Sequence, residues 1–144
     1  MTIQVLNGAN LGRLGTREPT VYGSTTYAQL VDLVEKTARD LGVEVQVRQT
    51  DDEAELLRWV HAIADAGDAV LINPGGWSHT SVVLRDALAA VEAPVVELHI
   101  SNIHQREEFR HHSYVSGVAD GVIAGLGVQG YVLGLQWLAQ QGLT

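Results

Sequence analysis

A long polar loop near the start of the sequence carries side chains that suit acid–base chemistry. It spans residues 8–25 and contains Asn10, Arg17 and Tyr22 among four glycines. A guanidinium close to a phenol favours the phenolate, and a phenolate can act as a general base. Loops of this length are commonly functional, so we predict a lid that closes on an anionic ligand. A flexible surface loop and a tyrosine that only packs against the next helix are the alternatives, and the pattern leaves both open.

A second polar stretch follows an apolar segment near the middle of the sequence. Asn73 precedes a Pro-Gly-Gly turn and His79. The amide side chain, the N–H groups of Gly75 and Gly76 and the imidazole could bind an oxyanion or a substrate hydroxyl. The same residues are also an ordinary turn that leads into a helix, and this interpretation stays open.

A third polar stretch places a histidine at the end of another apolar segment. Glu97 lies two residues before His99, and in a strand both side chains point to the same side. The carboxylate could therefore orient the imidazole for acid or base work. The backbone amides of Ile100 and Ser101 come next and could receive a substrate carboxylate. His99 as a residue that is only packed at the strand end is the alternative.

Residues 104–112 are rich in histidine and arginine. His104, His111 and His112 suggest a metal site, but adjacent histidine side chains diverge and no second group of ligands is spaced to match them. We therefore expect no metal. Arg106 and Arg110 lie one helical turn apart, and they could bind an anion or pair with the neighbouring glutamates in solvent.

The glycines of residues 125–130 fit the dinucleotide-binding fingerprint, since they follow an expected strand and open an expected helix. That fingerprint needs a further strand and an acidic residue about 20 positions on, whereas the sequence ends at Thr144. We therefore expect these glycines to serve close packing between strand and helix.

Apolar segments alternate with helical patterns along the sequence, which is typical of a single α/β domain over residues 1–144. The expected strands are residues 3–7, 43–47, 69–73, 95–99 and 121–124, and the expected helices are residues 27–41, 52–66, 80–91 and 128–140, with a helical turn near 107–112. Thr26 with Gln29 predicts a capping box for the first helix, and Asp52 with Glu55 marks the start of the second. The alternating pattern of residues 43–47 predicts an edge strand.

Strands joined by crossover connections form a mostly parallel sheet with helices on both faces. We predict a flavodoxin-like three-layer α/β sandwich whose five strands have the order 2-1-3-4-5. Ligands bind beyond the carboxyl ends of the strands in such sheets. The site should therefore lie just after Asn7, Asn73 and His99.

The composition excludes several kinds of chemistry. The 144 residues are 46% hydrophobic, with a formal net charge of −8, no cysteine and, beside eight arginines, a single lysine, Lys36. Without cysteine there is no thiolate nucleophile, disulfide or thiolate metal site. The acidic balance disfavours nucleic acid, and no apolar run approaches the roughly 20 residues that span a bilayer. The first residues carry no targeting signal, so we expect a cytoplasmic globular protein.

Taken together, these segments resemble the type II dehydroquinases, the 3-dehydroquinate dehydratases of the shikimate pathway. The matching stretches are residues 6–11, 15–19, 21–23, 73–81, 97–104, 106–107, 109–110 and 125–131. They cover nearly the whole chain in order, with one departure at Ala9, where the family usually has proline. The resemblance implies elimination of water from 3-dehydroquinate through an enolate, without metal or cofactor, by dodecamers made of trimers.

The resemblance also implies a role for each candidate site residue. Tyr22 is the expected base, Arg17 holds it as phenolate, and His99 is the expected acid. The residues expected to bind substrate are Asn73, His79, Asp86, Ile100, Ser101 and Arg110, while Glu97 orients His99 and Asn10 supports the site. Asp86 is expected to reach the site of a neighbouring subunit.

A phosphoacceptor receiver and a flavin-binding module are the alternative functions for this fold class. A receiver needs acidic residues at the ends of the first and third strands, where this sequence has Asn7 and Asn73. A flavin-binding module would carry a bound yellow chromophore on purification. Lys36 lies in the middle of a predicted helix and away from every strand end, so a lysine Schiff base is not expected.

Overall fold

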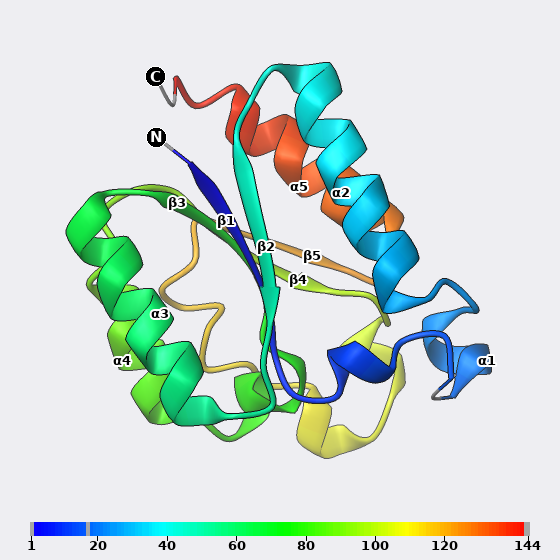
Figure 1. The fold of residues 1–144 in the computed structure, drawn as a ribbon. Helices are drawn as coiled ribbons and strands as arrows, with labels where there is room; N and C mark the ends of the chain where they lie inside the picture. The colour runs from blue at the N-terminus through cyan, green and yellow to red at the C-terminus, as the bar shows by residue number, and fades with distance from the viewer. Residues whose placement is uncertain (1, 17, 143–144) are drawn as a thin grey trace.

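The computed structural model describes residues 2–16 and 18–142, and its centre is one five-stranded parallel sheet of order β2-β1-β3-β4-β5 (Figure 1). The strands are β1 (Ile3–Asn7), β2 (Val45–Gln49), β3 (Ala69–Asn73), β4 (Val95–His99) and β5 (Gly121–Ala124). The predicted strand order is confirmed, and β2 is an edge strand as its alternating pattern indicated. β2 begins two residues later than predicted, because the N–H of Val43 bonds the Ala38 carbonyl at the end of the preceding helix, beside Gly42 in the left-handed conformation.

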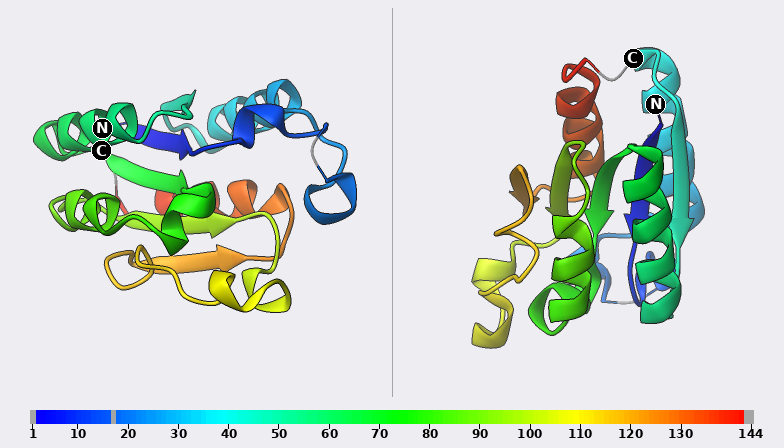
Figure 2. Two further views of the ribbon diagram at one scale, coloured as in Figure 1. Left: turned by 90° about the horizontal axis from the view of Figure 1, so that it is seen from below. Right: turned by 90° about the vertical axis from the view of Figure 1, so that its left-hand side faces the viewer.

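Helices cover both faces of the sheet (Figures 1 and 2). They are α2 (Tyr27–Leu41) and α5 (Gln129–Ala139) on one face, and α3 (Glu53–Ala66) and α4 (Val82–Ala89) on the other. The capping box of Thr26 and Gln29 is confirmed, and the Asp52 carboxylate caps α3 by accepting from two backbone N–H groups. α4 begins two residues later than predicted, because Ser81 is its N-cap and the residues before it form a 3₁₀ turn over Gly75–His79.

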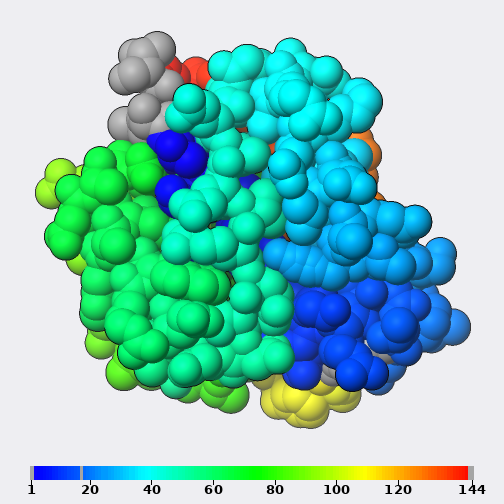
Figure 3. All heavy atoms as spheres, in the orientation of Figure 1, coloured from blue at the N-terminus to red at the C-terminus, as the bar shows by residue number. Residues whose placement is uncertain are grey.

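The connections that follow β1 and β4 at the carboxyl edge of the sheet contain four short helical segments among the described residues, of which the sequence patterns predicted one. The long loop after β1 holds a 3₁₀ turn (Leu11–Arg13) and the four-residue helix α1 (Pro19–Tyr22). The predicted turn near residues 107–112 is present as a 3₁₀ turn (Glu108–Arg110), preceded by another (Ile103–Gln105). In the space-filling view the blue long loop lies beside the yellow segment that carries these turns (Figure 3).

The glycines near the sheet allow segments to approach closely. A Cβ at Gly130 would lie 2.7 Å from the Cδ1 of Leu98, which confirms the interpretation as a packing residue for Gly130. A Cβ at Gly127 would meet nothing within 4 Å, so this glycine serves its positive φ of 63° and not close packing. A Cβ at Gly8, directly after β1, would lie 2.4 Å from the backbone oxygen of Pro74. The N–H of Gly8 donates to the carbonyl of Asn73 at 2.8 Å, so the loops after β1 and β3 leave the sheet in contact.

We expect Gly8→Ala to lower the free energy of unfolding by about 1–3 kcal/mol or more, because the clash is with backbone and can be relieved only by moving a loop. Urea unfolding of purified protein measures this difference. The control is Gly121→Ala, where an added Cβ meets nothing within 4 Å and the change should stay within about 0.5 kcal/mol. Equal effects in the two variants would show that the close approach at Gly8 does not constrain the fold.

Candidate active site

A pocket of about 200 Å³ opens at the carboxyl edge of the sheet, where the sequence predicted it. This volume suits a small metabolite. Its walls are formed by the ends of β3 and β4, by the long loop and by the two 3₁₀ turns after β4. The predicted site residues among them are Asn10, Tyr22, Asn73, His79, His99, Ile100, Ser101 and Arg110.

His99 and Glu97 form a buried pair at the end of β4. The Nε2 of His99 donates to the Oε2 of Glu97 at 2.6 Å, and the exposed fractions of the two residues are 5% and 0%. The strand places both side chains on one side, as predicted. Because Nε2 is engaged by the carboxylate, Nδ1 is the nitrogen of His99 that can exchange a proton with a ligand.

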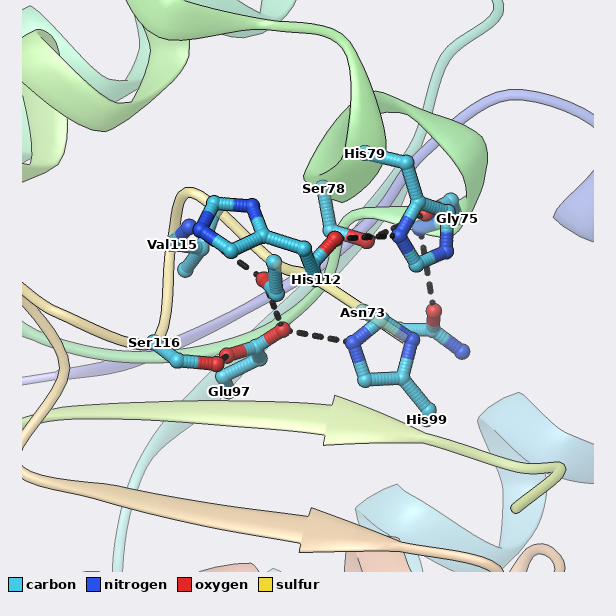
Figure 4. Close-up of polar contacts among 10 residues, drawn as sticks. Asn73, Gly75, Ser78, His79, Glu97, His99, His112, Val115 and Ser116 are labelled. Carbon is cyan, nitrogen blue, oxygen red and sulfur yellow. Dashed lines mark hydrogen bonds and ion pairs between the residues drawn. The ribbon is translucent and has the colours of Figure 1, made fainter. Parts of the chain in front are cut away.

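The Glu97 carboxylate has two further donors, which are the hydroxyls of Ser113 and Ser116 (Figure 4). Burial alone would raise the pKa of Glu97. The hydrogen bonds from His99 and the two serines outweigh burial and hold the pKa of this carboxyl below its ordinary value. Glu97 is therefore ionised at neutral pH and places a buried negative charge beside His99.

His79 lies beside His99, with the rings stacked at a centroid distance of 6.1 Å and an interplanar angle of 19°. The Nδ1 of His79 donates to the carbonyl of His112 at 2.8 Å, which leaves Nε2 as an acceptor for a ligand hydroxyl. Burial lowers the pKa of His79, and the nearby charges of His99 and Arg110 lower it further, against the opposing effect of the His112 carbonyl. His79 is therefore neutral when it acts as an acceptor.

Tyr22 ends the short helix α1, and its hydroxyl accepts a hydrogen bond from the Nη1 of Arg106 at 2.8 Å. The same guanidinium lies 5.2 Å from the centroid of the phenol ring and donates to the Oγ of Ser101 at 3.3 Å. The sequence left the role of Arg106 open, and no local pattern connects it with a tyrosine 84 positions earlier. Arg17, the expected partner of Tyr22, lies outside the described residues.

Asn73 forms the floor of the pocket and is held from two sides. Its Nδ2 donates to the hydroxyl of Tyr131 at 2.9 Å, and that hydroxyl donates to the Oδ1 of Asn7 at 2.6 Å. The N–H of Gly75 donates to the Oδ1 of Asn73 at 3.2 Å. The prediction that the Gly75 amide is available to an oxyanion is therefore wrong, because this N–H already has an acceptor within the protein.

Three predicted residues complete the comparison with the sequence. Asn10 lines the pocket at the start of the long loop, where its N–H donates to the Oδ1 of Asp51 at 2.8 Å. Arg110 lines the pocket and also pairs with Glu107 at 2.9 Å, so the two interpretations of this arginine are compatible. Asp86 does not line the pocket of its own chain. It lies on the outer face of α4 beside Arg85, at 2.9 Å.

Lys36 is also far from the pocket. It is exposed on α2 and pairs with Asp40 one helical turn later, at 2.8 Å. Within residues 2–16 and 18–142, no group of three or more histidine, aspartate or glutamate side chains is arranged to hold a metal ion. None of the helices described is both long enough and apolar enough to cross a membrane.

Comparison with known proteins gives a consistent result. Residues 1–139 match the model of the family described as dehydroquinase class II. The 3-dehydroquinate dehydratase of Mycobacteroides abscessus is 66% identical over 137 residues, which are 95% of each chain. The 3-dehydroquinate dehydratase of Salinispora tropica is 63% identical over 139 residues, which are 96% of this chain and 97% of that protein.

A solved structure agrees with these relatives. The crystal structure of the type II dehydroquinase from Propionibacterium acnes superimposes with a TM-score of 0.96 at 53% identity, and 97% of each chain is covered. The family match extends over nearly the whole sequence and includes every described segment that forms the pocket. The chain therefore belongs to the class II dehydroquinase family.

Proposed function

We propose that this chain eliminates water from 3-dehydroquinate with Tyr22 as the base and His99 as the acid. Its family makes it a 3-dehydroquinate dehydratase, a hydro-lyase of the shikimate pathway that forms no Schiff base. The observation that carries the assignment of roles is that one pocket holds both a phenol bonded to a guanidinium and a histidine bonded to a buried carboxylate.

Tyr22 begins the reaction as phenolate. The positive charge of Arg106, 2.8 Å from the phenol oxygen, favours this form. The phenolate takes a proton from carbon 2 of the substrate, and the electron pair of the broken C–H bond moves toward the ketone to give an enolate. Arg17 is proposed to share this work, as the resemblance implied. Tyr131 and Gly75 fix the orientation of the Asn73 amide. The second proton of its Nδ2 is proposed to donate to a water or to the enolate oxygen itself.

His99 completes the elimination as an imidazolium. It transfers the proton on Nδ1 to the hydroxyl of the neighbouring carbon, so that the C–O bond breaks and water leaves while the carbon–carbon double bond forms. The imidazole of His99 is then neutral, and its Nε2–H still donates to the carboxylate of Glu97. A proton passes from Tyr22 back to His99 through solvent before the next turnover.

The remaining residues bind the substrate. The backbone amides of Ile100 and Ser101 hold its carboxylate, while His79 and Arg110 bind its hydroxyls, and Asn10 supports the start of the lid. No metal or cofactor takes part in this proposal.

Asp86 is proposed to complete the site of a neighbouring subunit in a dodecamer made of trimers. Its position on the outer face of α4 supports this role, because it cannot contribute to the pocket of its own chain. Val82 and Val83 on the same helix are 49% and 53% exposed. Apolar side chains with this exposure suit a surface that is covered by another subunit.

The proposed activity predicts that the purified protein converts 3-dehydroquinate to 3-dehydroshikimate, whose conjugated ketone absorbs in the ultraviolet. The rate of absorbance increase measures the reaction directly. Tyr22→Phe, which keeps the ring, serves as the background control. If the wild-type protein is folded but produces no absorbance change, the activity is excluded.

For the base, we expect Tyr22→Phe to lower kcat by about 10²–10⁴-fold, the usual contribution of a general base. Arg106→Gln should lower it by about ten- to a hundred-fold, because a hydrogen bond to a charged group is lost. Steady-state kinetics and thermal unfolding measure both variants. Arg39→Gln on the exposed side of α2 is the matched control, with unchanged kinetics. Activity close to wild type in Tyr22→Phe contradicts the phenolate mechanism.

For Asp86, we expect Asp86→Ala to reduce activity although the residue lies outside its own pocket. Co-expression of Asp86→Ala chains with Tyr22→Phe chains should restore part of the activity. Some sites of a mixed trimer then combine an intact Tyr22 from one chain with an intact Asp86 from another. The specific activity of separated hybrids measures this complementation. Hybrids that are no more active than the two parent variants would show that Asp86 does not act between subunits.

A further inference from the structure

The loop of residues 112–116, between the last 3₁₀ turn and β5, lies beside both pocket histidines (Figure 4). The carbonyl of His112 accepts from His79, and the hydroxyls of Ser113 and Ser116 donate to Glu97. The N–H of Tyr114 donates to the carbonyl of Ser78 at 2.7 Å, which fastens the loop to the turn that carries His79. One loop therefore bonds the imidazole of His79 directly and reaches the imidazole of His99 through Glu97.

The hydrogen bond from Ser113 has a defined direction. Its Oγ accepts the N–H of Val115 at 3.2 Å and lies 2.6 Å from the Oε2 of Glu97. Because a lone pair of this oxygen faces Val115, the hydroxyl proton is free to point at the carboxylate. Ser116 donates to the other carboxylate oxygen. Both oxygens of Glu97 are thus engaged by hydroxyl donors, and Oε2 also accepts the proton of His99.

We propose that Ser113 and Ser116 are positioning residues that set how tightly the Glu97–His99 pair holds its extra proton. This inference rests on the proposed role of His99 as the acid. The two hydroxyls act through Glu97 and do not touch the pocket, so they are not catalytic residues themselves.

The direction of the effect follows from the charge of Glu97. Hydroxyl donors stabilise the carboxylate when His99 is neutral, and they matter less when the imidazolium already balances the charge. Without them the unbalanced carboxylate becomes costly in its buried position, so the pair keeps its proton to higher pH. His99 is then a weaker acid. The other charged or titratable groups that line the pocket with it are Tyr22, His79, Arg106 and Arg110, and the substitutions proposed here leave all four in place.

The test compares Ser113→Ala and Ser116→Ala with the hydroxyl-retaining Ser113→Thr and Ser116→Thr. In each alanine variant we expect kcat to fall about ten-fold, the equivalent of one hydrogen bond to a charged group, with KM within about two-fold. The alkaline limb of the kcat–pH profile should move upward by about one pH unit. The threonine variants should recover most of both effects. An alkaline limb that stays in place in both alanine variants overturns the proposal.

Ser81→Ala is the control for a merely structural loss. This serine is 4% exposed and its hydroxyl caps α4 by accepting from Leu84, so its removal costs stability without touching Glu97. We expect lower thermal stability and an unchanged pH profile. If Ser116→Ala does not fold, Ser116→Cys gives the same readout, because it keeps the volume and is a weak donor. A shift of the pH profile in Ser81→Ala equal to that in Ser116→Ala also overturns the proposal.

A double-mutant cycle tests whether the serines act through Glu97. In a Glu97→Gln background, Ser116→Ala should change kcat by less than about two-fold, since no carboxylate remains to be stabilised. Effects that multiply independently would contradict the route through Glu97.

Nitrogen-15 NMR of the histidine rings in the resting protein separates this inference from the proposed activity. Titration of His99 should shift upward by about one pH unit in Ser116→Ala without any substrate present. A protein that shows this shift but no turnover would leave the inference intact and remove the dehydratase function. A protein that turns over 3-dehydroquinate while the titration of His99 stays unchanged in Ser116→Ala would keep the dehydratase function and overturn the inference.

Discussion

The central strands of the sheet are buried on both faces, so every polar group that they carry must find its hydrogen-bond partner within the protein. β1, β3 and β4 are buried along their whole length, and yet they end in Asn7, Asn73 and the pair of Glu97 and His99. Their partners come from elements that follow later in the chain. Satisfying these few polar side chains links the sheet to α5 and to the loop before β5, and it builds the floor of the pocket.

The same constraint gives the polar side chains single orientations. The hydroxyl of Tyr131 is fully buried and bridges Asn7 to Asn73, and burial raises the pKa of its phenol, so that it stays a neutral donor and acceptor. A carbonyl holds one nitrogen of His79, and a carboxylate holds one nitrogen of His99. Polar groups whose orientations are already fixed need not reorient when charge develops in a transition state. They therefore stabilise that charge without a cost in reorganisation energy.

The walls of the pocket differ from its floor. Tyr22 comes from a four-residue helix within a long loop, and its contact with Arg106 joins this loop to the segment after β4. A guanidinium suits this contact, because it remains charged and can bond Tyr22 and Ser101 from one planar group. The imbalance between eight arginines and one lysine thus agrees with a mechanism that uses permanent charge and a phenolate.

Local patterns in the sequence determined most of the fold. Apolar segments, helix caps and the two-residue spacing of Glu97 and His99 act over a few positions, and the strand order followed from general rules for parallel sheets. These patterns also placed Asn73 and His99 at one edge. Residue types made Tyr22 a candidate base, and the resemblance to a family supplied its part in this reaction and the role of Asp86.

Only the tertiary structure decided which partners those residues meet. Arg106 reaches Tyr22 across 84 positions, and Ser113 and Ser116 reach Glu97 from a loop with no regular pattern. Such contacts depend on where loops pack after the sheet has formed. Side-chain periodicity records which face of its own element a residue occupies, and it contains no information on the loop that will lie against that face.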